Sequence, residues 1–161
     1  MKTPLRHHAR VFNSLVASSL ALWRGTSLVK AAKAPAKLLK LYDMEGSPYC
    51  RAVREVLTAL GLDAEIYPCP KGGQRFRPLV EKLGGKQQFP YLVDPNTGVA
   101  MYESGDIVAY LFKTYGQCDT PRAYKAAGVI MPYVSGLGTV VRAMRGLNYR
   151  PSGSEAAIYD I

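Results

Sequence analysis

The sequence predicts an α/β fold built on one four-stranded mixed sheet with helices on both faces. Apolar runs and helical patterns alternate in the order βαβαββα between residues 38 and 116. A right-handed crossover makes the first two strands parallel. The segment 94–98, Asp-Pro-Asn-Thr-Gly, lies between two short apolar runs and is a strong hairpin signal. A hydrophobic content of 48% and a charged content of 20% are typical of a globular chain.

The first strand and the first helix follow from hydrophobic periodicity. An apolar run predicts a strand over 38–44. Residues 48–60 repeat apolar side chains at helical spacing, and those on one face are Val53, Val56, Leu57 and Leu60. Gly61 is expected to end this helix, because glycine accepts a left-handed backbone.

The remaining elements are shorter. We expect a strand, a short helix, two hairpin strands and a last helix at 65–67, 76–83, 91–93, 99–102 and 105–115. Ser104 is expected to cap the last helix. Open α/β sheets bind ligands at the edge where parallel strands end, and Ser47, Cys50 and Cys69 would lie near that edge.

The net charge of +9 belongs to the N-terminal arm and not to the domain. Residues 1–42 hold eight basic and no acidic side chains, whereas residues 43–115 hold eight basic and nine acidic ones. Nucleic-acid binding would need basic and aromatic residues interleaved on the folded domain. That pattern is missing, so we expect no nucleic-acid partner.

The arm, residues 1–37, has three interpretations: a targeting peptide, an interfacial helix attracted to anionic lipid, or a helix packed on the domain. Its uncharged run, 11–23, is too short for a membrane span of about 20 residues. Residues 31–36, Ala-Ala-Lys-Ala-Pro-Ala, are typical of a linker.

The cysteines and histidines predict no metal site. Cys50, Cys69 and Cys118 have no metal-ligand spacing, and the histidines, His7 and His8, both lie in the arm. Few cysteines suit a reducing compartment. We therefore expect a cytoplasmic protein, with organelle targeting or peripheral membrane binding through the arm as alternatives.

Three separated motifs carry a resemblance to a known family. They are Ser-Pro-Tyr-Cys-Arg at 47–51, Gln-Phe-Pro-Tyr-Leu at 88–92, and Tyr-Glu-Ser-Gly-Asp-Ile at 102–107. In this order and at these separations they resemble the thioredoxin-like fold, as used by glutaredoxins and by the N-terminal domain of glutathione transferases. The sequence looks especially like proteins in which two such domains occur in tandem.

The resemblance implies glutathione as the ligand. A cis Pro90 would present the backbone of Phe89 to the cysteinyl part of the peptide, in the manner of an added strand. Ser104 and its helix start would hold the γ-glutamyl carboxylate, and Glu103 would accept from the ammonium group. The resemblance also assigns Tyr49 to the binding site.

The glycyl carboxylate of glutathione would be reached by Lys86 or Arg75. Nothing in the pattern chooses between these two cations.

The chain departs from glutaredoxins at Ser47, which stands where they place the attacking cysteine. A serine hydroxyl is not ionised near neutral pH, so the dithiol mechanism cannot run. In a transferase-like mechanism, Ser47 would donate to the glutathione sulfur, whose thiolate attacks an electrophile. In a thiol mechanism, Cys50 would be the reactive sulfur toward a disulfide, its pKa lowered by the helix N-terminus.

Two non-chemical interpretations remain beside these. Ser47 could only cap the helix while Cys50 fills space. The whole domain could then be a non-catalytic glutathione-binding or protein-interaction module of a tandem-domain protein.

Residues 117–161 are expected to form a helical tail and linker, adding a C-terminal helix to the one expected in the arm. The tail echoes the arm, since 135–146 aligns with 14–25 and 158–161 aligns with 41–44. We interpret it as leading to a second copy of the domain. A homodimer is a further expectation for the assembly.

Overall fold

The structure, a computed structural model, describes residue 19 and residues 25–125. The elements are, in order, β1 (Leu39–Asp43), α2 (Pro48–Leu60), β2 (Ala64–Pro68), α3 (Arg77–Gly84), β3 (Tyr91–Asp94), β4 (Val99–Met101) and α4 (Ser104–Thr114). The predicted order βαβαββα is confirmed, with no bound shifted by more than one residue. The terminal helices and the second copy were predicted mostly for residues outside the described ranges.

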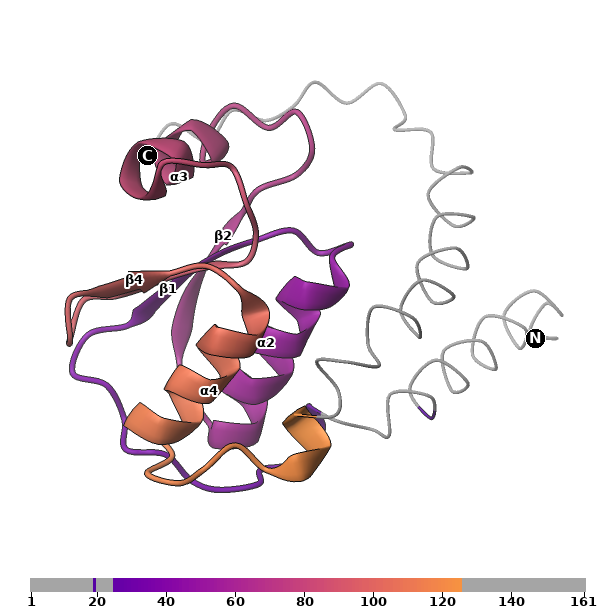
Figure 1. The fold of residues 1–161 in the computed structure, drawn as a ribbon, viewed down its shortest axis with the longest axis vertical. Helices are drawn as coiled ribbons and strands as arrows, with labels where there is room; N and C mark the ends of the chain where they lie inside the picture. Colours follow the sequence, from indigo (N-terminus) through magenta and orange to yellow (C-terminus); the bar gives the residue numbers. More distant parts are fainter. Residues whose placement is uncertain (1–18, 20–24, 126–161) are drawn as a thin grey trace, which may run out of the picture.

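The sheet has the strand order β2-β1-β3-β4. The β1–β2 pair is parallel, whereas the β1–β3 and β3–β4 pairs are antiparallel, so the predicted mixed sheet is confirmed. Figure 1 shows α2 and α4 side by side on one face of the sheet and α3 on the opposite side. Within the described residues, no helix is long and apolar enough to cross a membrane.

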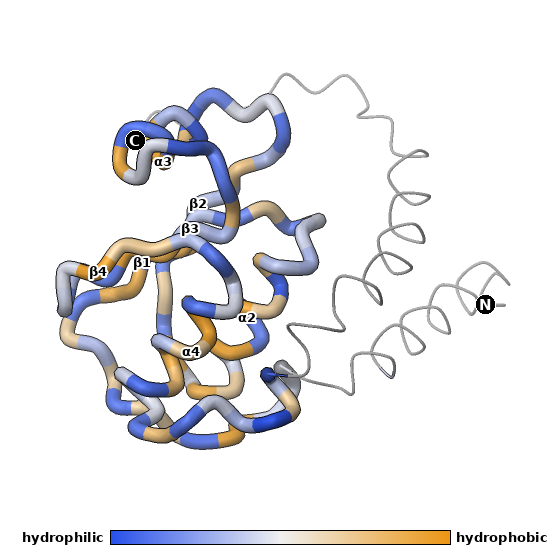
Figure 2. Tube along the Cα trace, viewed as in Figure 1, coloured by the Kyte–Doolittle hydropathy of each residue, from blue (hydrophilic) through white to orange (hydrophobic). Residues whose placement is uncertain are grey.

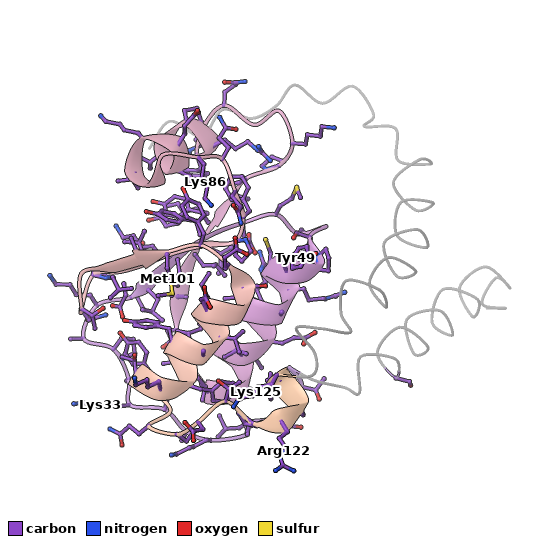
Figure 3. The ribbon with its side chains drawn as sticks, in the orientation of Figure 1. Lys33, Tyr49, Lys86, Met101, Arg122 and Lys125 are labelled. Atoms are coloured by element: carbon purple, nitrogen blue, oxygen red, sulfur yellow. The ribbon has the colours of Figure 1, made fainter. Side chains whose placement is uncertain are left out.

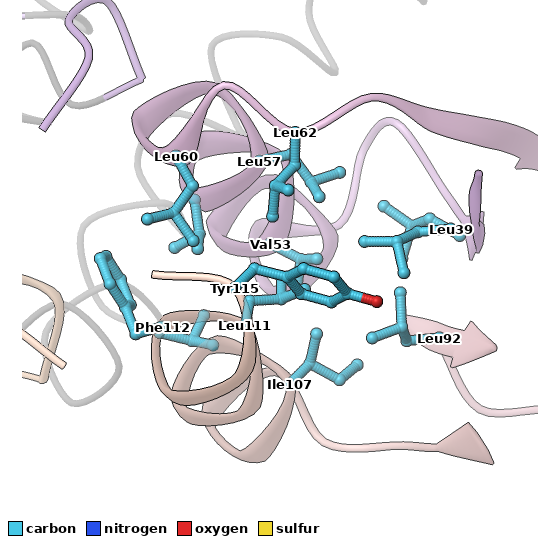
Figure 4. Packing of buried hydrophobic residues seen from close by; sticks show 13 residues of the cluster. Leu39, Val53, Leu57, Leu60, Leu62, Leu92, Ile107, Leu111, Phe112 and Tyr115 are labelled. Atoms are coloured by element: carbon cyan, nitrogen blue, oxygen red, sulfur yellow. The ribbon is translucent and has the colours of Figure 1, made fainter. Parts of the chain in front are cut away.

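The main core lies between the sheet and the α2–α4 pair (Figure 4). The apolar face predicted for α2 is buried as expected. It packs against the inward side chains of β1, β3 and α4, among them Leu39, Leu92, Ile107, Leu111 and Phe112. Gly61 ends α2 at φ 63°, and its N–H donates to the carbonyl oxygen of Thr58 at 3.1 Å. A side chain would be strained at that backbone angle.

The α3 face of the sheet carries a smaller, aromatic core. Tyr42, Tyr67 and Tyr91 come from adjacent strands, and the rings of Tyr42 and Tyr67 stack at 4.7 Å between centroids. Val80 is the buried residue that α3 contributes. Figure 2 shows that the segments flanking α3 are mostly hydrophilic. Among the described residues, a short helix with polar surroundings covers this face.

The expected linker, residues 31–36, contacts the domain through backbone hydrogen bonds. Ala32 N–H donates to the carbonyl oxygen of Leu60 at 3.0 Å, and Lys33 N–H donates to that of Tyr115 at 3.1 Å. Just before them, Val29 N–H donates to the Ala59 carbonyl oxygen at 2.7 Å. These acceptors lie at the ends of α2 and α4, where helices leave carbonyl groups without internal partners.

The same end of the domain holds a buried polar network, and we call it the Asn96 end, after the β3–β4 turn. Asn96 exchanges two hydrogen bonds with the backbone of Lys37, at 2.7 and 2.8 Å. Asp94 is fully buried and accepts hydrogen bonds from the hydroxyls of Tyr110 and Tyr115 at 2.5 and 2.6 Å. The network ties the start of β1 to the hairpin and to α4.

Candidate functional site

Strand register brings the three motifs to one end of the sheet, opposite the Asn96 end. Tyr42 pairs with Tyr91, and Leu92 pairs with Met101. Continuing each register by one or two residues places 89–90 beside the end of β1 and beside 103. The chain leaving β1 enters α2 at Ser47.

We call this region the Ser47 end. It comprises Ser47, the Phe89–Pro90 bond and the start of α4 at Glu103 and Ser104. In Figure 3, Tyr49 and Lys86 mark the Ser47 end, whereas other labelled cations lie at the opposite end of the domain. The three sequence motifs, 47–51, 88–92 and 102–107, are therefore neighbours in space.

Ser47 caps α2, with Pro48 in the first turn. Its backbone is extended, with φ −83° and ψ 125°, and its Oγ accepts from the N–H of Cys50 at 3.4 Å. A hydroxyl has one donor and two acceptor sites, so the Ser47 O–H keeps a proton to donate while its oxygen caps the helix. Tyr49, two residues after Ser47, is 47% exposed.

Cys50 does not have the character expected of a reactive thiol. It is 1% exposed, and its Sγ accepts from the backbone N–H of Met44 at 3.4 Å. Burial raises the pKa of the Cys50 thiol, and the hydrogen bonds that favour the thiolate do not offset it. The predicted lowering of this pKa is therefore wrong, because burial outweighs the hydrogen bonds with Met44 and Ser47.

Cys69, after β2, is also buried, and burial raises its pKa to about 11. Its N–H donates to the carbonyl oxygen of Asp43 at 2.6 Å. Asp43 is itself buried and paired with the guanidinium of Arg54, whose second nitrogen donates at 3.0 Å. These contacts fasten the end of β1 to α2 and β2 beneath the Ser47 corner.

The Phe89–Pro90 peptide bond is cis, as predicted. Pro90 is buried and Phe89 is half-buried. The guanidinium of Arg77 lies 4.7 Å from the centre of the Phe89 ring, and its Nε donates to the carbonyl oxygen of Pro70 at 2.8 Å. Arg77 therefore joins the loop after β2 to the loop before β3. Sequence reasoning missed it, because no local pattern signals a contact between two loops.

The start of α4 differs from the prediction. Glu103, not Ser104, is the N-cap residue, and Ser104 is the first helical residue. Glu103 has φ 63°, and its carbonyl oxygen accepts from the N–H of Ile107 at 2.9 Å. This left-handed turn starts the helix one residue early and frees the Ser104 hydroxyl from the capping role. The first N–H groups of a helix have no partner within it, so they are available to an anion.

The candidate cations for a glycyl carboxylate both lie over aromatic rings. The Lys86 ammonium is 4.7 Å from the Tyr102 ring centre, and the Arg75 guanidinium is 4.8 Å from that of Phe76. Both side chains are on exposed residues. Among the described residues, no group of three or more His, Cys, Asp or Glu side chains could hold a metal ion.

Gln88 makes a contact that the sequence did not predict. Its Nε2 donates to the Oε1 of Glu103. Gln88 stood in the second motif, but only its neighbours Phe89 and Pro90 were given roles. The signal that could have found it is the hairpin register, which places 88–90 beside 103–105.

Comparison with known proteins identifies the family of this domain. Residues 41–120 match the model of the glutathione S-transferase N-terminal domain. The chain is similar to glutathione S-transferase D7 of Drosophila melanogaster, with 33% identity over 85 residues, or 52% of this chain and 37% of the relative. The chain thus spans little more than a third of that curated relative.

Two solved structures are also similar. One is the Bombyx mori glutathione transferase BmGSTD1, at 29% identity and TM-score 0.46, covering 53% of this chain and 39% of that one. The other is a Nilaparvata lugens delta-class glutathione transferase, at 31% identity and TM-score 0.39, covering 48% and 36%.

Proposed function

Residues 41–120 belong to the glutathione S-transferase N-terminal domain family. We therefore propose that the chain binds glutathione at the Ser47 end and acts as a glutathione-dependent transferase. The observation that carries the proposal is the meeting of a hydroxyl, a cis-proline strand start and a helix N-terminus at one end of the sheet. These three features offer partners for a thiol, a peptide backbone and a carboxylate.

Glutathione would extend along this end from α2 to α4. Its cysteinyl backbone would pair with that of Phe89, as an extended peptide pairs with an open sheet edge. Its γ-glutamyl carboxylate would accept from the N–H groups of the first turn of α4 and from the Ser104 hydroxyl. Its ammonium group would lie at the Glu103 carboxylate, and Tyr49 would flank the peptide.

The chemical step would be attack by the glutathione thiolate on an electrophilic carbon. The Ser47 O–H donates to the sulfur and stabilises the negative charge, which lowers the pKa of the bound thiol. A C–S bond then forms, and the leaving group departs with its electron pair. Ser47 is itself buried, at 7% exposed, but Cys50 is more deeply buried, at 1%, and the raised pKa of its thiol disfavours the thiolate, so this role favours Ser47 over Cys50.

A titration calorimeter tests binding first. We expect the parent protein to bind glutathione and Ser104→Ala to bind about tenfold more weakly, since a hydrogen bond to a charged group is lost. No heat from the parent protein would overturn the proposal. Equal affinities of the two proteins would remove Ser104 from the binding site.

Conjugation of a chloronitrobenzene electrophile then tests the chemistry. Ser47→Ala should keep most of the glutathione affinity and lose at least about tenfold in kcat, the value of one hydrogen bond to a thiolate. Cys50→Ala is the matched control and should keep kcat. Binding without any conjugation by the parent protein would favour the non-catalytic module. The proposal also includes an electrophile as the second substrate and a homodimer as the assembly.

A further inference from the structure

Two segments at the Ser47 end, 84–90 ahead of β3 and 102–104 at the start of α4, are joined by two side-chain hydrogen bonds. The Tyr102 hydroxyl donates to the carbonyl oxygen of Lys86 at 2.8 Å. The Gln88 amide donates to the Glu103 carboxylate. The two bonds run in opposite directions between neighbouring positions, so they hold the segments in a fixed register.

The close approach of these segments depends on a glycine. A Cβ atom at Gly84 would lie 2.1 Å from the Tyr102 hydroxyl oxygen, closer than any real contact. The Lys86 ammonium also lies over the Tyr102 ring, at 4.7 Å from its centre. Tyr102 is thus enclosed by the segment that carries Gln88, and Gln88 faces Glu103 as a consequence.

Gln88 stands at a junction of the two halves of the proposed site. It directly precedes Phe89, the residue whose backbone would pair with the cysteinyl group, and it holds Glu103, which directly precedes Ser104. Glu103 is exposed, and a free glutamate side chain would lose rotamer entropy on binding. The Gln88 amide occupies Oε1 and leaves Oε2 of the same carboxylate to a ligand.

We propose that Gln88 is a positioning residue that orients the Glu103 carboxylate toward the ammonium group of the γ-glutamyl arm of glutathione. This inference rests on the proposed function. Gln88 itself touches no reacting atom. Its effect is to fix an otherwise mobile carboxylate before the ligand arrives, which reduces the entropy lost on binding.

The main test is Gln88→Met, which keeps the length of the side chain and removes its hydrogen bond. Glutathione affinity, measured by calorimetry, should fall roughly fivefold to tenfold, as expected for one hydrogen bond to a charged group. The matched control is Gln87→Met, because Gln87 contacts Arg77 and Glu81, at 3.2 and 2.7 Å. Its affinity should match that of the parent protein. Thermal unfolding curves of both variants check that they are folded before their affinities are compared.

A double-mutant cycle separates positioning from a general structural effect. In a Glu103→Gln background, Gln88→Met should cause no further loss, because the group through which it acts is gone. Cysteinylglycine, which lacks the γ-glutamyl arm, should bind the parent protein and Gln88→Met equally. Additive losses in the double variant, or an equal loss of cysteinylglycine, would overturn the inference.

Gln88→Glu adds a pH readout that a structural role would not give. Two facing carboxylates repel when both are ionised and can share a proton when one is protonated. The affinity of this variant relative to the parent protein should therefore recover as the pH falls toward 4.5, whereas that of Gln88→Met should not.

The outcomes distinguish the two proposals. Absence of binding by the parent protein overturns the proposed function. Binding by the parent protein with equal affinities for Gln88→Met and Gln87→Met overturns only the positioning role.

Discussion

The two ends of the domain treat their helix termini in opposite ways. At the Asn96 end, the carbonyl groups that end α2 and α4 receive N–H donors from Val29, Ala32 and Lys33. At the Ser47 end, the N-termini of the same two helices begin at Ser47 and Glu103, and only α2 has a side-chain cap, at 3.4 Å. The chain thus satisfies its own polar groups at one end and leaves donors for a ligand at the other.

This difference separates stability from binding. The Asn96 end has a fully buried carboxylate with several donors, an arrangement that is costly to disturb. At the Ser47 end, Ser47 and Pro90 are buried, but Tyr49 and Glu103 are exposed, and the N-terminus of α4 has no side-chain cap, an arrangement that a ligand can complete. Substitutions at the Asn96 end should therefore change mainly stability, and substitutions at the Ser47 end should change mainly binding.

The largest effect is expected for Asp94→Asn. Hydrogen bonds from Tyr110 and Tyr115 would lose their charged acceptor, which should lower the free energy of unfolding by about 2–3 kcal/mol in denaturant titrations near neutral pH. Glutathione affinity of the folded fraction should be unchanged. A loss of affinity with no loss of stability would break the separation between the two ends.

In the parent protein, the contribution of Asp94 to stability should be lost in acid. Burial acts to raise the pKa of Asp94, but hydrogen bonds from Tyr110, Tyr115 and Asn96 outweigh it, and the pKa lies below its ordinary value of 3.8. A lowered folded-state pKa stabilises the fold above pH 3.8, and this contribution is lost as the pH falls through the folded-state value. In the same acid range, Asp94→Asn should lose less stability than the parent protein.

A smaller effect is expected for Ala32→Pro. Proline has no N–H, so the Leu60 carbonyl oxygen would lose its donor, and unfolding free energy should fall by about 1–2 kcal/mol. Ala31→Pro, one residue earlier, is the comparison, since within the described residues its N–H donates to no backbone carbonyl group. Equal stability of Ala32→Pro and the parent protein would mean that the segment contributes nothing to the fold.

The two serines at the Ser47 end should differ in how much they stabilise the fold. Ser47→Ala should cost about 1 kcal/mol, the usual value of an N-cap. Ser104→Ala should cost only a few tenths of a kcal/mol, because Ser104 is inside the first turn and does not cap α4. Similar losses for both variants in urea titrations would restore Ser104 as a cap.

The smallest effect concerns thiol reactivity in the folded protein. Cys50 and Cys69 are about 1% exposed with raised pKa values, whereas Cys118 is half-buried. Iodoacetamide with mass-spectrometric mapping should therefore modify Cys118 first and the other two only after unfolding. Rapid modification of Cys50 at neutral pH would return it to consideration as the reactive sulfur.

Local patterns predicted the framework well. The bounds of α2 were predicted at both ends, because apolar spacing, Pro48 and Gly61 all act within one helix. The hairpin followed from turn residues that favour it in any context. The predicted site residues in the three motifs converge because sheet register, and not chance, brings the segments together.

The errors share a physical cause, since each depends on contacts distant in sequence. The pKa of Cys50 depends on burial by the assembled fold, which outweighs the hydrogen bonds with Met44 and Ser47. The hydrogen bonds from Ala32 and Lys33 to the ends of α2 and α4 were not predicted, because they use backbone N–H groups, which every sequence has. The start of α4 shifted because Glu103 takes a left-handed angle that glutamate rarely adopts alone. Gln88 and Arg77 join loops that no periodicity relates.

The hydrogen bonds donated by the backbone N–H groups of Val29, Ala32 and Lys33 also define where a protease could cut without destabilising the folded part. Cleavage before Val29 would leave those donors attached to α2 and α4. Cleavage after Lys33 would remove them and expose the carbonyl groups that they satisfy. In limited proteolysis, the stable core fragment should therefore begin ahead of Val29, about ten residues before the first strand. The sheet begins at Leu39, but the smallest durable product of digestion begins earlier.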